Sequence, residues 1–313
     1  MLTDYKIRSN PLARIDSVKQ FKFGIAEVII EFIADGDLRL ELPKCHPQFI
    51  ISEGSPDLSL RVHYGPLPEL KLEPRSFDGN FTLDLYSSSG KHIITVSSSF
   101  SGSIPVRVAV IDADFRHGEL YVRPLLIPGE PGSPPMIDGK PCICPTKLLD
   151  RLLFNILLSR RRGVVIHGCG VVVDGEGILL TGISGAGKST LANLWKKREN
   201  ATVIGDECIV VRRVDGRFWI YGTPWYSRAK IASPQGAPLK RVFFIKHSLE
   251  NCATPLKASD AVATLLARSF SDYSKHSGVL YTLGLLSDIA EQVPCHELGF
   301  VPDERVLDYI SKM

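Results

Sequence analysis

Residues 181–190 read TGISGAGKST, and this stretch decides how the C-terminal half of the chain is expected to fold. Gly182 to Ser189 fit the pattern G-x-x-x-x-G-K-[ST]. Glycines let backbone N–H groups turn inward around phosphate oxygens, and a following helix directs its positive N-terminus at the same anion. The apolar strand GILL before the stretch and the helical segment TLANLWKK after it supply the context that the motif requires. The sequence therefore predicts a nucleoside triphosphate site in an α/β P-loop domain.

The side chains of this loop have distinct expected roles. Lys188 is expected to reach the outer phosphates and to take part in the chemistry, whereas Ser189 offers its hydroxyl to Mg²⁺. ATP and Mg²⁺ are therefore the expected cofactors. The residues predicted to contact the nucleotide are Gly182, Ser184, Gly185, Ala186, Gly187, Lys188, Ser189 and Thr190.

Two carboxylates follow the loop after one helix, in the strand-like segment ATVIGDECIVV. Asp206 and Glu207 fall where the chain has returned to the sheet, which is where an acidic residue that works with a phosphate loop is expected. In such a pair, one carboxylate holds magnesium while the other accepts the proton of an attacking hydroxyl. We expect Asp206 to be the base, and Ser189, Asp206 and Glu207 to hold the metal. A solvated turn between two strands is the alternative.

His167, in the segment VVIHGCG, is a third candidate for the catalytic site. The charge of a histidine changes near neutral pH, so the residue could move a proton. A lone histidine on an apolar strand is, however, commonly a core residue whose nitrogens are satisfied. The residues alone leave both interpretations open.

The succession IHGCGVVVDGEGILLTGISGAGKSTLA, followed by IGDE, resembles the superfamily of HPr kinase/phosphorylase and ATP-dependent phosphoenolpyruvate carboxykinase. The resemblance extends over residues 148–212 and implies that His167 is an active-site histidine. It also implies that Asp206 is a catalytic base or metal partner, with Glu207 as its acidic neighbour. Because the chain is too short for a carboxykinase, the HPr-kinase-like branch is implied. That branch implies transfer of the γ-phosphoryl group of ATP to a hydroxyl of a peptide, a protein or a small molecule.

Two departures from that family bear on the substrate. HPr kinases carry an acidic residue in the loop where Ile183 stands here, and a later glycine-rich signature that contains a glutamate. In this chain no carboxylate occurs between Asp215 and Glu250. These differences argue against phosphorylase activity and against HPr as the acceptor. In this stretch the chain resembles the divergent HPr-kinase-related proteins more than the HPr kinases themselves.

The first 123 residues have a different pattern. Short apolar or alternating runs such as AEVIIEFI, LSLRVHY and VRVAVID are separated by turn residues, as in DGD and FDGN. They predict a mostly antiparallel β domain, which is expected to recognise the acceptor or a partner. Residues 124–145 are rich in proline and are predicted to be a linker through which regular structure does not run. Residues 146–313 are then the kinase domain.

Composition excludes several classes of partner. A formal net charge of +3 offers no broad field for nucleic acid, and the sequence shows neither a secretory signal nor an apolar run long enough for a membrane span. Seven scattered cysteines favour free thiols over a disulfide framework. We expect a cytoplasmic protein that binds a nucleotide and an acceptor, without nucleic acid or membrane. Assembly into a homo-oligomer is left open.

Other functions compete with this one. Small P-loop kinases resembling adenylylsulfate or gluconate kinase share the loop, but those chains begin near it, whereas here a hairpin and a whole domain precede it. Transport ATPases need a downstream signature of the LSGGQ type, and none follows Ser189. A regulatory module that binds the nucleotide without catalysis is the third alternative. The fate of labelled γ-phosphate, to a serine-containing acceptor, to water or nowhere, separates these functions.

Overall fold

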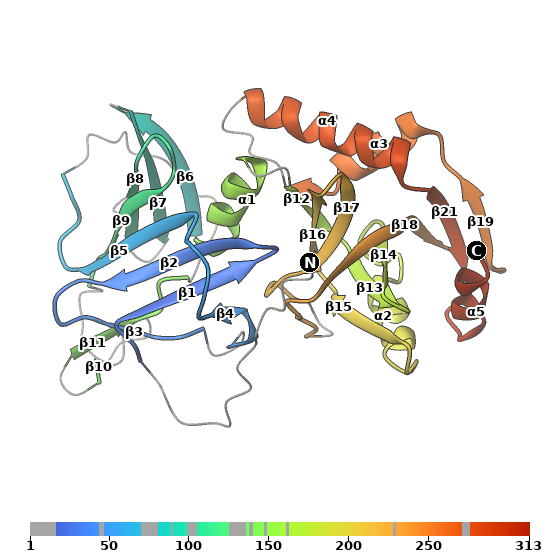
Figure 1. The fold of residues 1–313 in the computed structure, drawn as a ribbon, viewed down its shortest axis with the longest axis horizontal. Helices are drawn as coiled ribbons and strands as arrows, with labels where there is room; N and C mark the ends of the chain where they lie inside the picture. Colours follow the sequence, from blue (N-terminus) through green and yellow to red (C-terminus); the bar gives the residue numbers. More distant parts are fainter. Residues whose placement is uncertain are drawn as a thin grey trace. The chain divides into compact units, whose positions relative to one another are not determined.

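The computed structural model describes residues 17–43, 47–69, 81–88, 90–98, 105–124, 136–137, 140–146, 149–160, 163–227, 230–270 and 276–313. Contacts divide the chain into two compact units. The first comprises Met1–Gly24 and Val28–Leu153, and the second comprises Ile25–Glu27 and Phe154–Met313. Within these described residues, large sheets and five α-helices make the fold mixed α/β (Figure 1).

The first unit is built on an eight-stranded sheet with the order β4-β1-β2-β5-β9-β8-β7-β6. Strands β6 to β9 pair antiparallel in succession, whereas β2–β5 and β5–β9 are parallel pairs that the sequence pattern does not indicate. Alternate side chains of β5 are buried, as the LSLRVHY pattern predicts. The strands are β1 (Gln20–Ile25), β2 (Val28–Ala34), β4 (Ile50–Ile51), β5 (Leu58–Tyr64), β6 (Phe81–Ser88), β7 (Lys91–Ser98), β8 (Arg107–Ile111) and β9 (His117–Val122). A 3₁₀ helix, Pro47–Phe49, precedes β4.

The predicted linker contains regular structure, which corrects the expectation for residues 124–145. Strands β10 (Met136–Ile137) and β11 (Lys140–Ile143) form a small sheet with β3 (Arg39–Leu40). Pro141 lies opposite Met136 of β10 and precedes the two residues of β11 that pair with β3, so its missing N–H is not needed for the pairing with β3. The Arg107 guanidinium donates hydrogen bonds to the carbonyls of Cys144 and Pro145. The described end of the stretch therefore belongs to the first unit, and residues 125–135 lie outside the described residues.

The second unit contains a ten-stranded sheet whose main path is β15-β13-β14-β18-β17-β16-β12-β20. The long strand β18 pairs with β14 along one edge, and with β17 and then β21 along the other. The strands are β12 (Gly163–His167), β13 (Cys169–Val173), β14 (Glu176–Thr181), β15 (Ala201–Gly205), β16 (Cys208–Val214), β17 (Arg217–Gly222), β18 (Gly236–His247), β19 (Cys252–Pro255), β20 (Ser269–Phe270) and β21 (Cys295–Phe300).

Helices cover both faces of this sheet (Figure 1). Successive β18 residues alternate between two buried clusters: Val242 packs in one and Phe243 in the other. The Val242 cluster includes residues of α3 (Ala258–Leu266) and α4 (His276–Gln292), and the Phe243 cluster includes residues of α2 (Lys188–Trp195) and α5 (Arg305–Ser311). Helix α1 (Asp150–Arg160) precedes β12. Among the described residues, none of the helices has both the length and the apolar composition needed to cross a membrane.

The hairpin predicted before the phosphate loop is present. Strands β13 and β14 pair antiparallel from Cys169↔Leu180 to Val173↔Glu176. The turn between them places Asp174 at φ 51° and Gly175 at φ 82°, which are the left-handed angles that a two-residue hairpin turn requires. Strand β14 then leads into the loop, and α2 follows it, overlapping the predicted helical segment TLANLWKK but beginning and ending two residues earlier. At the far end of α2, Trp195 is 1% exposed in the core.

Gly222, at the end of β17, lies where two backbone carbonyls approach closely. A Cβ at this position would lie 2.1 Å from the Ser233 oxygen and 2.2 Å from the Ile204 oxygen. We expect Gly222→Ala to lower the free energy of unfolding by about 1–3 kcal/mol, because the backbone must shift to admit the methyl group.

Gly284→Ala is the matched control, since among the described residues no atom outside the neighbouring backbone of α4 lies within 4 Å of its Cβ position. Alanine favours the helix, so this variant should be more stable by about 0.5–1 kcal/mol. Urea denaturation measures both changes. Equal stabilities of the two variants would contradict the close approach at Gly222.

Candidate active site

The loop between β14 and α2 has the backbone geometry of an anion cradle. Gly185 and Gly187 adopt φ angles of 82° and 101°, which other residues rarely adopt. A Cβ on Gly187 would also lie 2.5 Å from the Phe300 ring. Within the described part of the chain, no side chain caps the first turn of α2, so its N–H groups remain available to an anion. Of the polar loop residues, Ser184 and Thr190 are exposed and Ser189 is half-buried.

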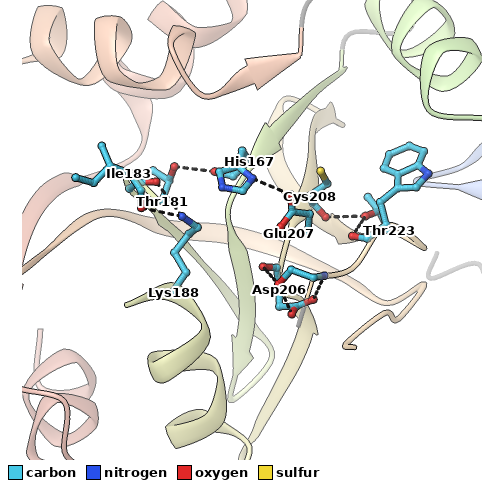
Figure 2. A network of polar contacts seen from close by, with 11 residues as sticks. His167, Thr181, Ile183, Lys188, Asp206, Glu207, Cys208 and Thr223 are labelled. Atoms are coloured by element: carbon cyan, nitrogen blue, oxygen red, sulfur yellow. Dashed lines mark hydrogen bonds and ion pairs between the residues drawn. The ribbon is translucent and has the colours of Figure 1, made fainter. Parts of the chain in front are cut away.

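Lys188 occupies a different position from the one that the sequence suggests. Its side chain is expected to reach outward to the outer phosphates, but here it is buried and folds back on the loop. The ammonium donates hydrogen bonds to the carbonyls of Gly182 at 3.0 Å and Ile183 at 3.1 Å (Figure 2). Burial lowers the pKa of Lys188, whereas the Glu207 carboxylate acts to raise it and the Arg268 cation acts to lower it. Lys188 is therefore in the electrostatic range of both residues.

His167 and Glu207 face one another beside the loop. The Nδ1 atom of His167 lies 3.5 Å from Oε1 of Glu207, and both side chains are partly exposed. The hydroxyl of Thr181, the last residue of β14, donates to the His167 carbonyl at 2.9 Å, which ties β12 to the start of the loop (Figure 2). The structure thus brings together the predicted histidine, one predicted carboxylate and the phosphate loop.

Asp206, the predicted base, is almost fully buried, with 1% of its surface exposed. Ser227 donates its backbone N–H to Oδ1 at 3.1 Å and its hydroxyl to Oδ2 at 2.7 Å. Asp206 therefore anchors the segment that follows β17. It also contributes to the environment of Cys169, because burial, and then the Asp206 charge, raises the pKa of that thiol to about 12. Adjacent acidic residues thus have different surroundings: Asp206 is buried, and Glu207 is accessible.

The two carboxylates occupy the corner where the chain passes from β15 to β16. The His167–Gly168 segment forms the neighbouring corner between β12 and β13, and the Gly168 N–H donates to the Glu207 carbonyl at 3.0 Å. Strands β12 and β16 pair so that His167 lies opposite Cys208. The side chains of His167 and Glu207 therefore meet because two corners of the sheet lie side by side.

Sequence reasoning missed several residues of this site. Ser227, Thr181 and Arg268 belong to no motif, and only the fold places them beside the predicted residues. His247 is a further example, because its Nε2 lies 2.8 Å from the Gly185 carbonyl of the loop. Thr181 and His247 each end a strand that lies next to the loop, and this position is the one signal that could have identified them.

Residues 149–284 match the model of a family described as SynChlorMet cassette protein ScmC. No curated protein matches the chain. The chain is similar to the solved structure of the Hpr(Ser) kinase/phosphatase from Coxiella burnetii, with 12% identity and a TM-score of 0.29, over 47% of this chain and 93% of that one. Similarity at this level assigns no activity, so the site residues have to support any functional conclusion.

Ser227→Ala tests the anchoring of the buried carboxylate. The change removes a hydroxyl that donates to Asp206, and hydrogen bonds to a charged group contribute about 1.5–3 kcal/mol. We expect the free energy of unfolding to fall by about that amount in chemical denaturation.

Ser233→Ala is the control, because its hydroxyl accepts one long, exposed hydrogen bond from the Gln235 N–H at 3.3 Å. Its expected effect is at most about 0.5 kcal/mol. If the two variants have the same free energy of unfolding, the hydrogen bond from Ser227 to Asp206 contributes little to stability.

Proposed function

We propose that this chain is an ATP-dependent phosphotransferase that transfers the γ-phosphoryl group to a hydroxyl of a peptide, a protein or a small molecule. The observation that carries the proposal is the position of Glu207, which faces His167 and acts electrostatically on Lys188 of the loop. A loop that only holds a nucleotide does not require a carboxylate and a histidine beside its lysine. Phosphoryl transfer uses such groups to orient the nucleophile and to hold magnesium.

The loop fits the phosphates of ATP through its backbone. The left-handed glycines at 185 and 187 and the uncapped start of α2 provide N–H groups at a positive helix end. Lys188 would exchange the carbonyls of Gly182 and Ile183 for phosphate oxygens. Hydrogen bonds to a charged acceptor are stronger than those to a carbonyl, which favours this exchange when the nucleotide binds.

The residues present also fit a magnesium ion that is shared with the nucleotide. Among the described residues, no group of three or more His, Cys, Asp or Glu could hold a metal ion. Mg²⁺ at phosphoryl-transfer sites is usually held by one or two protein groups together with the phosphates, and it neutralises their charge. The protein groups that would hold Mg²⁺ are the Ser189 hydroxyl at the start of α2 and the carboxylates of Asp206 and Glu207 at the corner between β15 and β16.

Asp206 is the proposed base, and its contact with Ser227 suggests how it would act. Its Oδ2 already accepts a hydrogen bond from a hydroxyl at 2.7 Å, which is the distance at which a base can take a proton from an alcohol. An acceptor hydroxyl that replaced the Ser227 hydroxyl would be oriented and deprotonated there. His167 would assist from the side of Glu207. The β-rich first unit is proposed to select the acceptor, since the phosphate motif lies wholly in the second unit.

A nucleotide-binding module without transfer is the second candidate. The burial of Asp206 and its two hydrogen bonds from Ser227 favour it, because a carboxylate used as an anchor needs no catalytic role. Measurement of phosphoryl transfer distinguishes the two candidates.

Lys188→Ala should weaken the binding of Mg-ATP at least about tenfold, because the variant loses a charged hydrogen-bond donor to the phosphates. Isothermal titration calorimetry measures the affinity, and circular dichroism checks the fold. Lys240→Ala, which removes an exposed lysine that pairs with Glu176, is the control and should bind as the wild type does. Identical affinities for wild type and Lys188→Ala would remove the claim that this loop binds the nucleotide.

Asp206→Asn should abolish phosphoryl transfer while retaining much of the nucleotide affinity, because the amide keeps the size of the side chain but cannot accept a proton. Glu207→Gln is the matched variant, and it should weaken the magnesium dependence of binding. The acceptor can be identified first by a mass-spectrometric screen of peptides and metabolites for an added phosphoryl group. If Asp206→Asn transfers at the wild-type rate, Asp206 is not the base.

A further inference from the structure

His247, the last residue of β18, contacts the phosphate loop from outside. Its Nε2 lies 2.8 Å from the Gly185 carbonyl oxygen. A carbonyl oxygen can only accept a hydrogen bond, so the imidazole must carry a proton on Nε2 and donate it. This side chain is exposed, and the proposed transfer chemistry does not use it.

The contact fixes one peptide unit of the loop at both ends. The carbonyl of Gly185 and the N–H of Ala186 belong to the same planar peptide and point in opposite directions. His247 holds the carbonyl, and the Ile183 carbonyl accepts the Ala186 N–H at 3.2 Å. Because Gly185 has φ 82° and no side chain, its peptide could otherwise rotate between several orientations.

Phe300 holds the imidazole in place. His247 and Phe300 lie opposite one another on the paired strands β18 and β21, and their rings stack with centroids 6.1 Å apart at 28°. Phe300 is fully buried, and its ring also occupies the space next to Gly187. The same two rings therefore support the loop at both of its left-handed glycines.

We propose that His247 is a positioning residue that sets the orientation of the Gly185–Ala186 peptide before the nucleotide binds. This inference rests on the proposed nucleotide-binding function of the loop. Ordering a glycine-rich loop costs conformational entropy, and a loop that is already held in place spends less binding free energy on ordering. His247 supplies that order through one N–H donor, without touching the reacting atoms.

The test compares three side chains at position 247 with Mg-ATP as the ligand. His247→Leu removes the donor and should weaken ATP binding by about three- to tenfold, the effect of one lost hydrogen bond. His247→Gln places an amide N–H near the position of Nε2 and should restore most of the affinity. Hydrogen exchange of the peptide spanning residues 182–190, without nucleotide, should be faster in His247→Leu and close to wild type in His247→Gln.

His117→Leu is the matched control, because it makes the same change at an exposed histidine of the first unit, and it should leave both measurements unchanged. Unchanged affinity and exchange in His247→Leu would overturn the inference. Equal losses in the Leu and Gln variants would also overturn it, since the donor would then not matter. If the wild type and Lys188→Ala bind ATP equally, the proposed function fails, and the exchange measurement still decides the role of His247 in the loop.

Discussion

The close approach of two backbone corners is the constraint on which the candidate site depends. The chain turns once at His167–Gly168 and once at Asp206–Glu207, and a hydrogen bond from Gly168 to the Glu207 carbonyl joins the corners. A Cβ on Gly168 would lie 2.9 Å from the Leu180 carbonyl of β14, so the packing of this corner against β14 favours a glycine there. His167 and Glu207 therefore face one another across the two corners, whereas Asp206 is buried against Ser227.

Much of the second unit follows from local sequence signals. The turn at Asp174 and Gly175, the strand before the loop and the helix after it are fixed by residues that lie close together in the chain, so the pattern predicts them. The roles expected of Lys188, Asp206 and Glu207 depend on the strand, loop and helix that this local pattern predicts. The partners of these side chains lie far away in sequence, as Ser227 does from Asp206, and no spacing rule reveals them.

The sequence was less informative about the first unit and about burial. Alternating runs predict strands but not which of them pair, and the parallel pairs of β2 with β5 and of β5 with β9 join segments that are separated by other elements. Prolines predicted an irregular linker, yet β11 forms: Pro141 lies opposite Met136 of β10, and the two residues that pair with β3 come after it. Asp206 and Glu207 are adjacent acidic residues, and the sequence does not distinguish their surroundings. The tertiary structure buries Asp206 and leaves Glu207 partly exposed.

The short helix α2 has a consequence for how the protein can be observed. It begins at Lys188, in contact with the loop, and ends at Trp195, whose ring is enclosed by the same apolar cluster as Phe243 and Leu307. The emission of an indole depends on the packing around it. Once Trp219 and Trp225 are replaced, Trp195 is therefore a natural optical probe at the opposite end of the helix from the phosphate cradle.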